Sequence, residues 1–140
     1  IGGGGLQSGT AIAAKAINPG IEVIGTEPFN ANDAYRSFKS GELIPSVNPQ
    51  TIADGLLTSL SRLTFTIIRK YVDDIVTVHE ANIKKALRFI IERMKIVVEP
   101  SSAVPFGAIL ENKIDISGKR VGIIISGGNV ELSKIPFVLE

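Results

Sequence analysis

A chain of 140 residues, 44% hydrophobic and 21% charged, has the composition of a globular domain rather than of a disordered protein. Fifteen basic and fourteen acidic residues give a net charge of +1 without any basic block, so we expect no nucleic-acid partner. The sequence has no cysteine for a disulfide or a thiolate metal site, and no apolar run approaches the ~18 residues of a membrane-spanning helix. We therefore expect no membrane partner, and we expect a reducing, cytoplasmic compartment.

Segments with helical periodicity alternate with short apolar runs along the chain. Helices are predicted over residues 9–17, about 33–39, about 63–71 and about 80–95, and a further helix is expected after Pro100. Asn32 or Asp33 can cap the second of these helices. Strands are predicted over residues 21–25, 74–78 and 120–126, and residues 41–55 are predicted to be a loop. This alternation favours an α/β architecture with a parallel sheet.

Two of these segments have the clearest patterns. Apolar residues repeat every 3.6 positions along residues 80–95 and predict one buried helix face, made of Ile83, Ala86, Leu87, Ile90, Ile91 and Met94. The run from Arg120 to Ser126 is almost continuously apolar, which is typical of a strand buried on both faces of a parallel sheet.

Four consecutive glycines, Gly2 to Gly5, stand at the start of the chain and are followed by an alanine-rich helix. Backbone without Cβ atoms lets several N–H groups close around one anion, and a helix N-terminus adds further donors. The run therefore predicts a phosphate-binding loop, with a flexible terminus or a tag remnant as the alternative. A phosphate loop normally follows a strand, and only Ile1 precedes this one, so we expect the chain to be part of a longer protein.

A second glycine-bearing loop, Ser126-Gly127-Gly128-Asn129, follows the last predicted strand. Ligands of open α/β sheets bind at the carboxyl ends of strands, so both glycine loops could flank one ligand. Taken alone, Ser126 is equally consistent with an ordinary cap at a strand end.

A third pattern, Glu27-Pro28-x-x-Ala31-x-Asp33, places two carboxylates six residues apart across a bend that enters a helix. Together with the Ala31 carbonyl, they could converge on one hard cation such as Mg²⁺ or Ca²⁺. The alternative is that both carboxylates are solvated charges at the start of a helix.

Taken together, these motifs resemble a specific enzyme family. The family is that of the serine racemases and threonine/serine ammonia-lyases, which are fold type II pyridoxal-phosphate enzymes. Its phosphate loop resembles Gly2-Gly3-Gly4-Gly5-Leu6-x-Ser8-Gly9. Its pyridine-ring loop resembles Ile125-Ser126-Gly127-Gly128-Asn129-Val130. Residues 51–55, 71–75 and 98–101 fall between these loops in the family's order. The resemblance spans nearly the whole chain but only the C-terminal part, roughly 40%, of a family member.

The resemblance implies a fold and a domain assignment. It implies an incomplete three-layer, parallel-sheet large domain like that of the tryptophan synthase β subunit. Residues 1–140 would form the C-terminal part of the pyridoxal-phosphate-binding domain, without its N-terminal part and without the small domain.

The resemblance also assigns cofactor-binding roles, with pyridoxal 5'-phosphate as the cofactor. The phosphate would be held by the glycines and the following amide, at Gly2, Gly3, Gly4, Gly5 and Leu6. The Ser126 hydroxyl would face the pyridine nitrogen and leave it largely unprotonated, a weaker electron sink that suits elimination of a β-hydroxyl. Glu99 would lie near the ring, or would merely cap the helix after Pro100.

Two further sets of residues match positions with known roles in the family. In serine racemase-like members, the residues that match Glu27, the Ala31 carbonyl and Asp33 bind a divalent ion. Arg93, Lys95 and Asn129 match positions that contact a nucleotide in animal serine racemases, although a solvated helix face is the competing interpretation.

No residue of this chain is assigned a catalytic role. The family's Schiff-base lysine lies in an N-terminal Ser-Phe-Lys-type segment. Ser37-Phe38-Lys39 has the same three residue types, but it follows the glycine loop. We therefore do not assign the role of the Schiff-base lysine to Lys39. Two residues also depart from the family's pattern: Ser102 stands where Gly or Ala is usual, and Pro105 interrupts a small-residue helix.

The predicted function is a pyridoxal-phosphate-dependent threonine/serine ammonia-lyase that releases a 2-oxo acid and ammonia, inactive as this chain alone. A serine racemase of the same family is the first alternative, and a non-enzymatic phosphate-binding or interaction fragment is the second. The expected partners are serine or threonine, the missing N-terminal half, and further copies of the complete enzyme in a homo-oligomer.

Overall fold

The computed structural model describes residues 1–135. The elements, in chain order, are α1 (Gly5–Ile17), β1 (Ile24–Pro28), α2 (Asp33–Ser40), the 3-10 turn η1 (Asp54–Leu56), α3 (Arg62–Tyr71), β2 (Asp74–Val78), α4 (Glu80–Phe89), the π-helical turn η2 (Ile90–Met94), α5 (Pro100–Leu110) and the 3-10 turn η3 (Leu132–Lys134). Among the described residues, no helix has the length and apolar character needed to cross a membrane.

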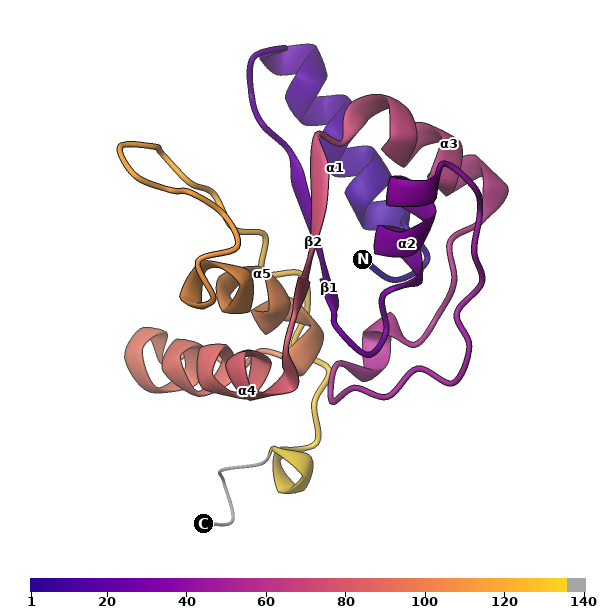
Figure 1. Ribbon diagram of the computed structural model, residues 1–140. Helices are drawn as coiled ribbons and strands as arrows, with labels where there is room; N and C mark the ends of the chain where they lie inside the picture. The colour runs from indigo at the N-terminus through magenta and orange to yellow at the C-terminus, as the bar shows by residue number, and fades with distance from the viewer. Residues whose placement is uncertain (136–140) are drawn as a thin grey trace.

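The two strands form a parallel pair at the centre of the molecule (Figure 1). They run in register from Ile24 opposite Asp74 to Pro28 opposite Val78. Helices α1, α2 and α3 lie on one side of the strands, and α4 and α5 lie on the other (Figure 1). This arrangement confirms the predicted α/β architecture with a parallel sheet between helical layers.

A hydrophobic core lies on each side of the strands. Ile75 belongs to the core beneath α1, α2 and α3, whereas Val78 packs with residues of α4 and α5. Side chains three positions apart on a strand point to opposite faces, so β2 contributes to both cores. Gly107 of α5 contacts this strand closely, because a Cβ atom there would lie 2.8 Å from Val78 Cγ1.

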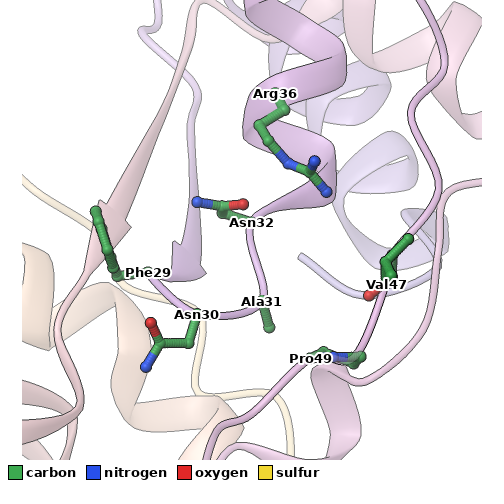
Figure 2. A pocket seen from close by; sticks show the side chains of 8 residues that line it. Phe29, Asn30, Ala31, Asn32, Arg36, Val47 and Pro49 are labelled. Carbon is green, nitrogen blue, oxygen red and sulfur yellow. The ribbon is translucent and has the colours of Figure 1, made fainter.

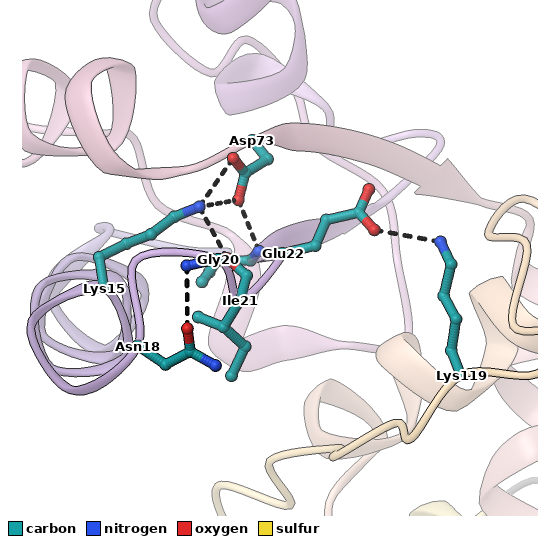
Figure 3. Close-up of polar contacts among 8 residues, drawn as sticks. Lys15, Asn18, Gly20, Ile21, Glu22, Asp73 and Lys119 are labelled. Carbon is teal, nitrogen blue, oxygen red and sulfur yellow. Dashed lines mark hydrogen bonds and ion pairs between the residues drawn. The ribbon is translucent and has the colours of Figure 1, made fainter.

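The first helix and the first strand begin at residues that differ from the predicted ones. α1 starts at Gly5 rather than Gly9, and β1 starts at Ile24 rather than Ile21. Side chains hold the preceding backbone instead: Lys15 Nζ donates to the Ile21 carbonyl at 2.7 Å, and Val23 N–H donates to Asp73 Oδ2 at 2.7 Å (Figure 3). Residues 21–23 are therefore tied to α1 and to the start of β2 rather than to the strand ladder.

The helix predicted over residues 80–95 divides in two. α4 ends at Phe89 and continues as the π-helical turn η2, which terminates at Lys95 with φ of 58°. Ile83, Ala86, Leu87 and Ile90 are buried as predicted, but Met94 is 54% exposed. Ile91 is half-buried and still packs against this core, and the wider π turn changes which side of the helix the following residues occupy, so the apolar period is lost after Ile91.

The strand predicted from Arg120 to Ser126 is wrong for this structure. These residues adopt no regular structure and are mostly exposed, including Val121 at 49% and Ile124 at 48%. A strand buried on both faces needs neighbouring strands to complete its hydrogen-bond ladder, and β1 and β2 pair only with each other among the described residues. An ion pair of 3.2 Å between Lys119 and Glu22 links this segment to the β1 side of the molecule (Figure 3).

Candidate functional site

The glycine run forms a turn that leads directly into α1. Gly4 is the N-cap residue, with φ of 82° and ψ of 0°, a left-handed conformation that favours glycine. A Cβ atom on Gly4 would lie 2.6 Å from Leu60 Cδ2, and one on Gly2 would lie 3.0 Å from the Gly55 carbonyl oxygen. Gly4 is therefore required by conformation and by space, and Gly2 by space.

The first turn of α1 offers free donors beside this loop. The amides of the first helical residues, from Gly5 onward, have no acceptor within the helix, and a Cβ atom on Gly5 would meet nothing within 4 Å. The loop itself is fixed from behind, because Thr64 Oγ1 donates to the Gly3 carbonyl at 2.9 Å. This combination of fixed backbone and open donors suits a phosphate group.

The second glycine loop is held by the start of α5. Ser102 Oγ accepts from the Gly127 N–H at 2.8 Å and lies 2.8 Å from the Gly127 carbonyl oxygen, to which it can donate. Glu99 N–H donates to the same carbonyl at 3.0 Å, and its carboxylate accepts from Asn129 N–H at 3.1 Å. Glu99 thus occupies the N-cap position of α5, but its side chain makes no cap hydrogen bond and binds the loop instead.

Close packing explains the two glycines of this loop. A Cβ atom on Gly127 would lie 2.9 Å from the Glu99 carboxylate, and one on Gly128 would lie 2.9 Å from the Val97 carbonyl oxygen. A larger residue at Gly128 would meet fixed backbone, whereas one at Gly127 would have to move the end of the Glu99 side chain. Close packing therefore favours glycine at both positions.

Both loops line one cavity of about 980 Å³. The structure brings together there all six residues that the sequence analysis assigned to the cofactor, namely Gly2, Gly3, Gly4, Gly5, Leu6 and Ser126. Glu99 and Ser101 line the same cavity. The Ser101 hydroxyl is buried and has no hydrogen-bond partner among the described residues. The sequence analysis did not single out Ser101, although its place in the resembling segment 98–101 was a signal.

The carboxylates of the Glu-Pro motif are buried at the end of β1 and the start of α2. Glu27 is 1% exposed, and its two oxygens accept from Ala34 N–H at 3.2 Å and from Tyr35 N–H at 2.6 Å. Burial raises the pKa of Glu27 to about 7, although these two amides oppose the shift. Glu27 therefore caps α2, a role that the sequence analysis gave to Asn32 or Asp33; Asn32 is the N-cap residue but makes no side-chain cap bond.

Asp33 is 1% exposed, and neither carboxylate oxygen has a hydrogen-bond partner in the described part of the chain. Burial raises its pKa, and the opposing influences are weaker: the amides of Asp33 and Leu60, the charge of the Arg36 guanidinium and the Ser46 hydroxyl lower the pKa, although no group reaches hydrogen-bond geometry. Both carboxylates are buried, so the alternative of solvated helix-start charges is wrong. A buried carboxylate without a partner is costly and would gain from a cation.

A small cavity of about 240 Å³ lies beside this motif, between the end of β1 and residues 46–49 (Figure 2). Its lining includes Ala31, whose carbonyl accepts no hydrogen bond from the described residues, and Arg36, which extends from α2 (Figure 2). Among the described residues, no three His, Cys, Asp or Glu side chains gather as a metal cluster, so any cation here would rely on two carboxylates, a carbonyl and water.

Three basic residues lie away from the large cavity's lining. Lys39 forms an ion pair with Asp74 at 2.6 Å and is not a lining residue. Arg93 and Lys95 are exposed in and just after η2. The geometry assigns none of the three to the site formed by the glycine loops.

A family model described as "Pyridoxal-phosphate dependent enzyme" matches residues 1–127. The chain belongs to this family. Serine racemase of Dictyostelium discoideum is 52% identical over 146 residues, covering all of this chain and 44% of that protein. L-threo-3-hydroxyaspartate ammonia-lyase of Saccharomyces cerevisiae is 47% identical over 135 residues, covering 96% of this chain and 41% of that protein.

Solved structures agree with this assignment to the pyridoxal-phosphate dependent enzymes. The crystal structure of a T.th. threonine deaminase matches with a TM-score of 0.84 and 42% identity, over 94% of this chain and 48% of that one. The chain thus spans less than half the length of the relatives that it matches. The proteins it resembles include both racemases and ammonia-lyases.

Proposed function

We propose that this chain supplies the cofactor-binding part of a pyridoxal-phosphate-dependent ammonia-lyase that acts on serine or threonine and releases a 2-oxo acid and ammonia. The observation that carries the proposal is that the Gly2–Gly5 loop and the Ser126 loop line one cavity. Similarity to ammonia-lyases and threonine deaminase over almost the whole chain supports the substrate class.

The residues of the cavity fit pyridoxal phosphate. The open amides at the start of α1 would hold the phosphate, where the helix dipole also favours negative charge. The Ser126 hydroxyl, exposed at the same cavity, would hold the ring nitrogen. Pyridoxal phosphate bound there would supply the electron-withdrawing ring that weakens bonds to the substrate's Cα atom.

This chain's own residues would orient the cofactor and set the charge on its ring. A serine hydroxyl donates a hydrogen bond without transferring its proton, so Ser126 would keep the ring nitrogen uncharged. The Glu99 carboxylate is turned to the Asn129 amide, which holds the loop in place. Departure of a β-hydroxyl needs only modest electron withdrawal, and this arrangement supports elimination.

Serine racemisation is the second candidate, favoured by the 52% identity to the Dictyostelium discoideum enzyme. Racemisation and elimination share the removal of the Cα proton. Residues outside this cavity can determine which of the two reactions follows. The two candidates therefore differ in the product rather than in the cofactor-binding loops.

We further propose that Glu27, the Ala31 carbonyl and Asp33 hold Mg²⁺ or Ca²⁺. Two buried carboxylates, one of them without any hydrogen-bond partner among the described residues, support this assignment. Each Glu27 oxygen accepts one backbone N–H and retains a lone pair for a cation. A bound cation would tie β1 to α2, at some distance along the chain from the glycine loops.

The test is an assay of the full-length protein that carries this chain, supplied with pyridoxal phosphate and Mg²⁺. L-Serine, L-threonine and L-threo-3-hydroxyaspartate would each be followed for 2-oxo acid and ammonia, and L-serine also for D-serine. We expect 2-oxo acid as the main product. D-Serine as the main product would favour the racemase. Binding of pyridoxal phosphate without formation of either product would favour a non-enzymatic phosphate-binding protein.

A further inference from the structure

Ser102 is the third residue of α5 and is fully buried. Its backbone is fixed in the first helical turn, where its N–H donates to the Glu99 carbonyl at 3.0 Å. A buried hydroxyl is costly unless it is hydrogen-bonded, so its position implies a specific partner. That partner lies 25 residues further along the chain, in the loop that carries Ser126.

The Ser102 hydroxyl contacts both polar groups of one residue. Its oxygen accepts from the Gly127 N–H at 2.8 Å, and it lies 2.8 Å from the Gly127 carbonyl, which can accept its proton. The Ser126 hydroxyl is 3.4 Å away, a longer contact. Since a hydroxyl has one proton, donation to Gly127 makes Ser126 the donor in this longer contact, which is weak enough for an acceptor in the cavity to take the Ser126 proton instead.

Other restraints on Ser126 are few. Residues 120–125 make no hydrogen bond to any described residue, so on that side Ser126 is restrained by the packing of Ile125 against the core beside α4 and α5 and not by a backbone hydrogen bond. On the other side, the Gly127 carbonyl is also held by the Glu99 amide, but the Gly127 N–H has Ser102 as its one described partner. The peptide between Ser126 and Gly127 therefore depends on the Ser102 side chain for its orientation.

We propose that Ser102 is a positioning residue of the cofactor site, which fixes the Ser126–Gly127 peptide and so directs the Ser126 hydroxyl toward the cofactor's ring nitrogen. The inference rests on the proposed function, because it needs pyridoxal phosphate in the cavity. It also gives a role to a residue that stands where the family's pattern has Gly or Ala.

The first test is Ser102→Ala in the full-length protein that carries this chain. Alanine is smaller than serine and favours helix, so α5 should be retained. We expect the dissociation constant of pyridoxal phosphate to rise about threefold to tenfold, the effect of losing one hydrogen bond. Hydrogen exchange should quicken at the Gly127 amide in the cofactor-free protein, and Ser102→Thr, which keeps the hydroxyl, should restore both values.

A control with the same hydrogen-bond pattern, at an exposed position, is Ser40→Ala. Ser40 Oγ likewise contacts the N–H and the carbonyl of one loop residue, Glu42, at 3.2 and 3.3 Å, but at the far end of α2. Its loss should leave cofactor affinity unchanged. An equal loss of affinity in Ser40→Ala would mean that general destabilisation, rather than positioning, explains the Ser102 result and would overturn the proposal.

The decisive test combines Ser102→Ala with Ser126→Ala and follows the absorbance of bound cofactor across pH. If Ser102 acts through Ser126, adding Ser102→Ala to Ser126→Ala should change neither the affinity nor the pH dependence further. Additive effects, or an unchanged affinity in Ser102→Ala alone, would overturn the inference. Failure of the unmodified protein to bind pyridoxal phosphate would instead overturn the proposed function, and this inference with it.

Discussion

The carboxylate of Glu99 lies 2.9 Å from the point that a Cβ atom on Gly127 would occupy. The two residues are far apart in the sequence, and their contact brings the Ser126 loop against the start of α5. The same carboxylate binds the Asn129 amide, so the packing and the hydrogen bonding of this loop depend on each other.

Replacing Gly127 with alanine should therefore displace the loop. We expect Gly127→Ala to lower the affinity for pyridoxal phosphate by about threefold to tenfold, because the added methyl group would push the end of the Glu99 side chain away from the Asn129 amide that it binds. Fluorescence titration with the cofactor measures the change. Gly9→Ala is the control, since a Cβ atom there meets nothing within 4 Å and Gly9 does not line the cavity, and it should bind the cofactor normally.

The glycine run offers a second pair of substitutions with opposite effects on stability. Gly4→Ala should destabilise the cofactor-free protein by about 1–3 kcal/mol, because Gly4 has a positive φ and touches Leu60. Gly5→Ala should be neutral or stabilising by about 0.5–1 kcal/mol, because the site is open and helical. Urea unfolding measures both changes, and equal destabilisation by the two variants would contradict the described turn.

Replacing Asp33 with asparagine should affect the stability of the protein and its affinity for Mg²⁺ in opposite directions. Asp33→Asn removes a buried charge whose oxygens have no hydrogen-bond partner among the described residues and whose pKa burial raises, so the metal-free variant should be at least as stable as the unmodified protein. Its affinity for Mg²⁺ should fall by at least about tenfold, and added Mg²⁺ should no longer raise its melting temperature. Calorimetry and thermal unfolding with and without Mg²⁺ test both parts.

Glu27→Ala is the companion variant for the cation site. It removes a second proposed ligand and also the acceptor for the Ala34 and Tyr35 amides, so it should lose both metal affinity and stability. Unchanged Mg²⁺ affinity in Glu27→Ala would reject Glu27 as a ligand.

The ion pair between Lys15 and Asp73 should make stability depend on pH at the acid end. The hydrogen bond from Lys15 holds the pKa of Asp73 below its ordinary value, and the Val23 amide adds to the effect. A lowered pKa means that the stabilisation is present above the unfolded value, about 3.9, and is lost as pH falls through the folded value. Asp73→Asn should therefore be less stable at pH 7 and equal in stability below about pH 2.

The size of this effect should be small. The Asp73 side chain is 39% exposed, so solvent screening limits the contribution to about 0.5 kcal/mol or less. Urea unfolding from about pH 2 to pH 7 measures it. Glu22→Gln, which breaks the exposed pair with Lys119, is the control and should have a smaller effect. A difference between Asp73→Asn and the unmodified protein that persists at the acid end would contradict the assignment.

Local features of the fold were predictable from sequence because their causes are local. The bounds of β2 match the prediction, and α2 ends at Ser40, within one residue of its predicted end, with Gly41 in a left-handed conformation after it. β-Branched residues and a left-handed glycine act within a few residues. The six cavity-lining residues to which the resemblance gives cofactor roles, and the two buried carboxylates, also belong to short motifs.

The failures of prediction involve contacts between distant segments. Residues 120–126 have the composition of a buried strand, but a strand also needs neighbours to bond with, and composition does not state where they are. The start of β1 was displaced because Lys15 and Asp73, 58 residues apart, bind the backbone of residues 21–23.

The sequence by itself determined that this chain carries a glycine-rich loop before a helix, a Ser-Gly-Gly-Asn loop and a pair of carboxylates, because each motif depends on residues close together in the chain. Only the tertiary structure decided that both loops line one cavity, that Asp33 is buried without a partner among the described residues, and that Ser102 holds Gly127. The physical reason is that burial and hydrogen bonding between residues far apart in the chain are properties of packing, which no local pattern encodes.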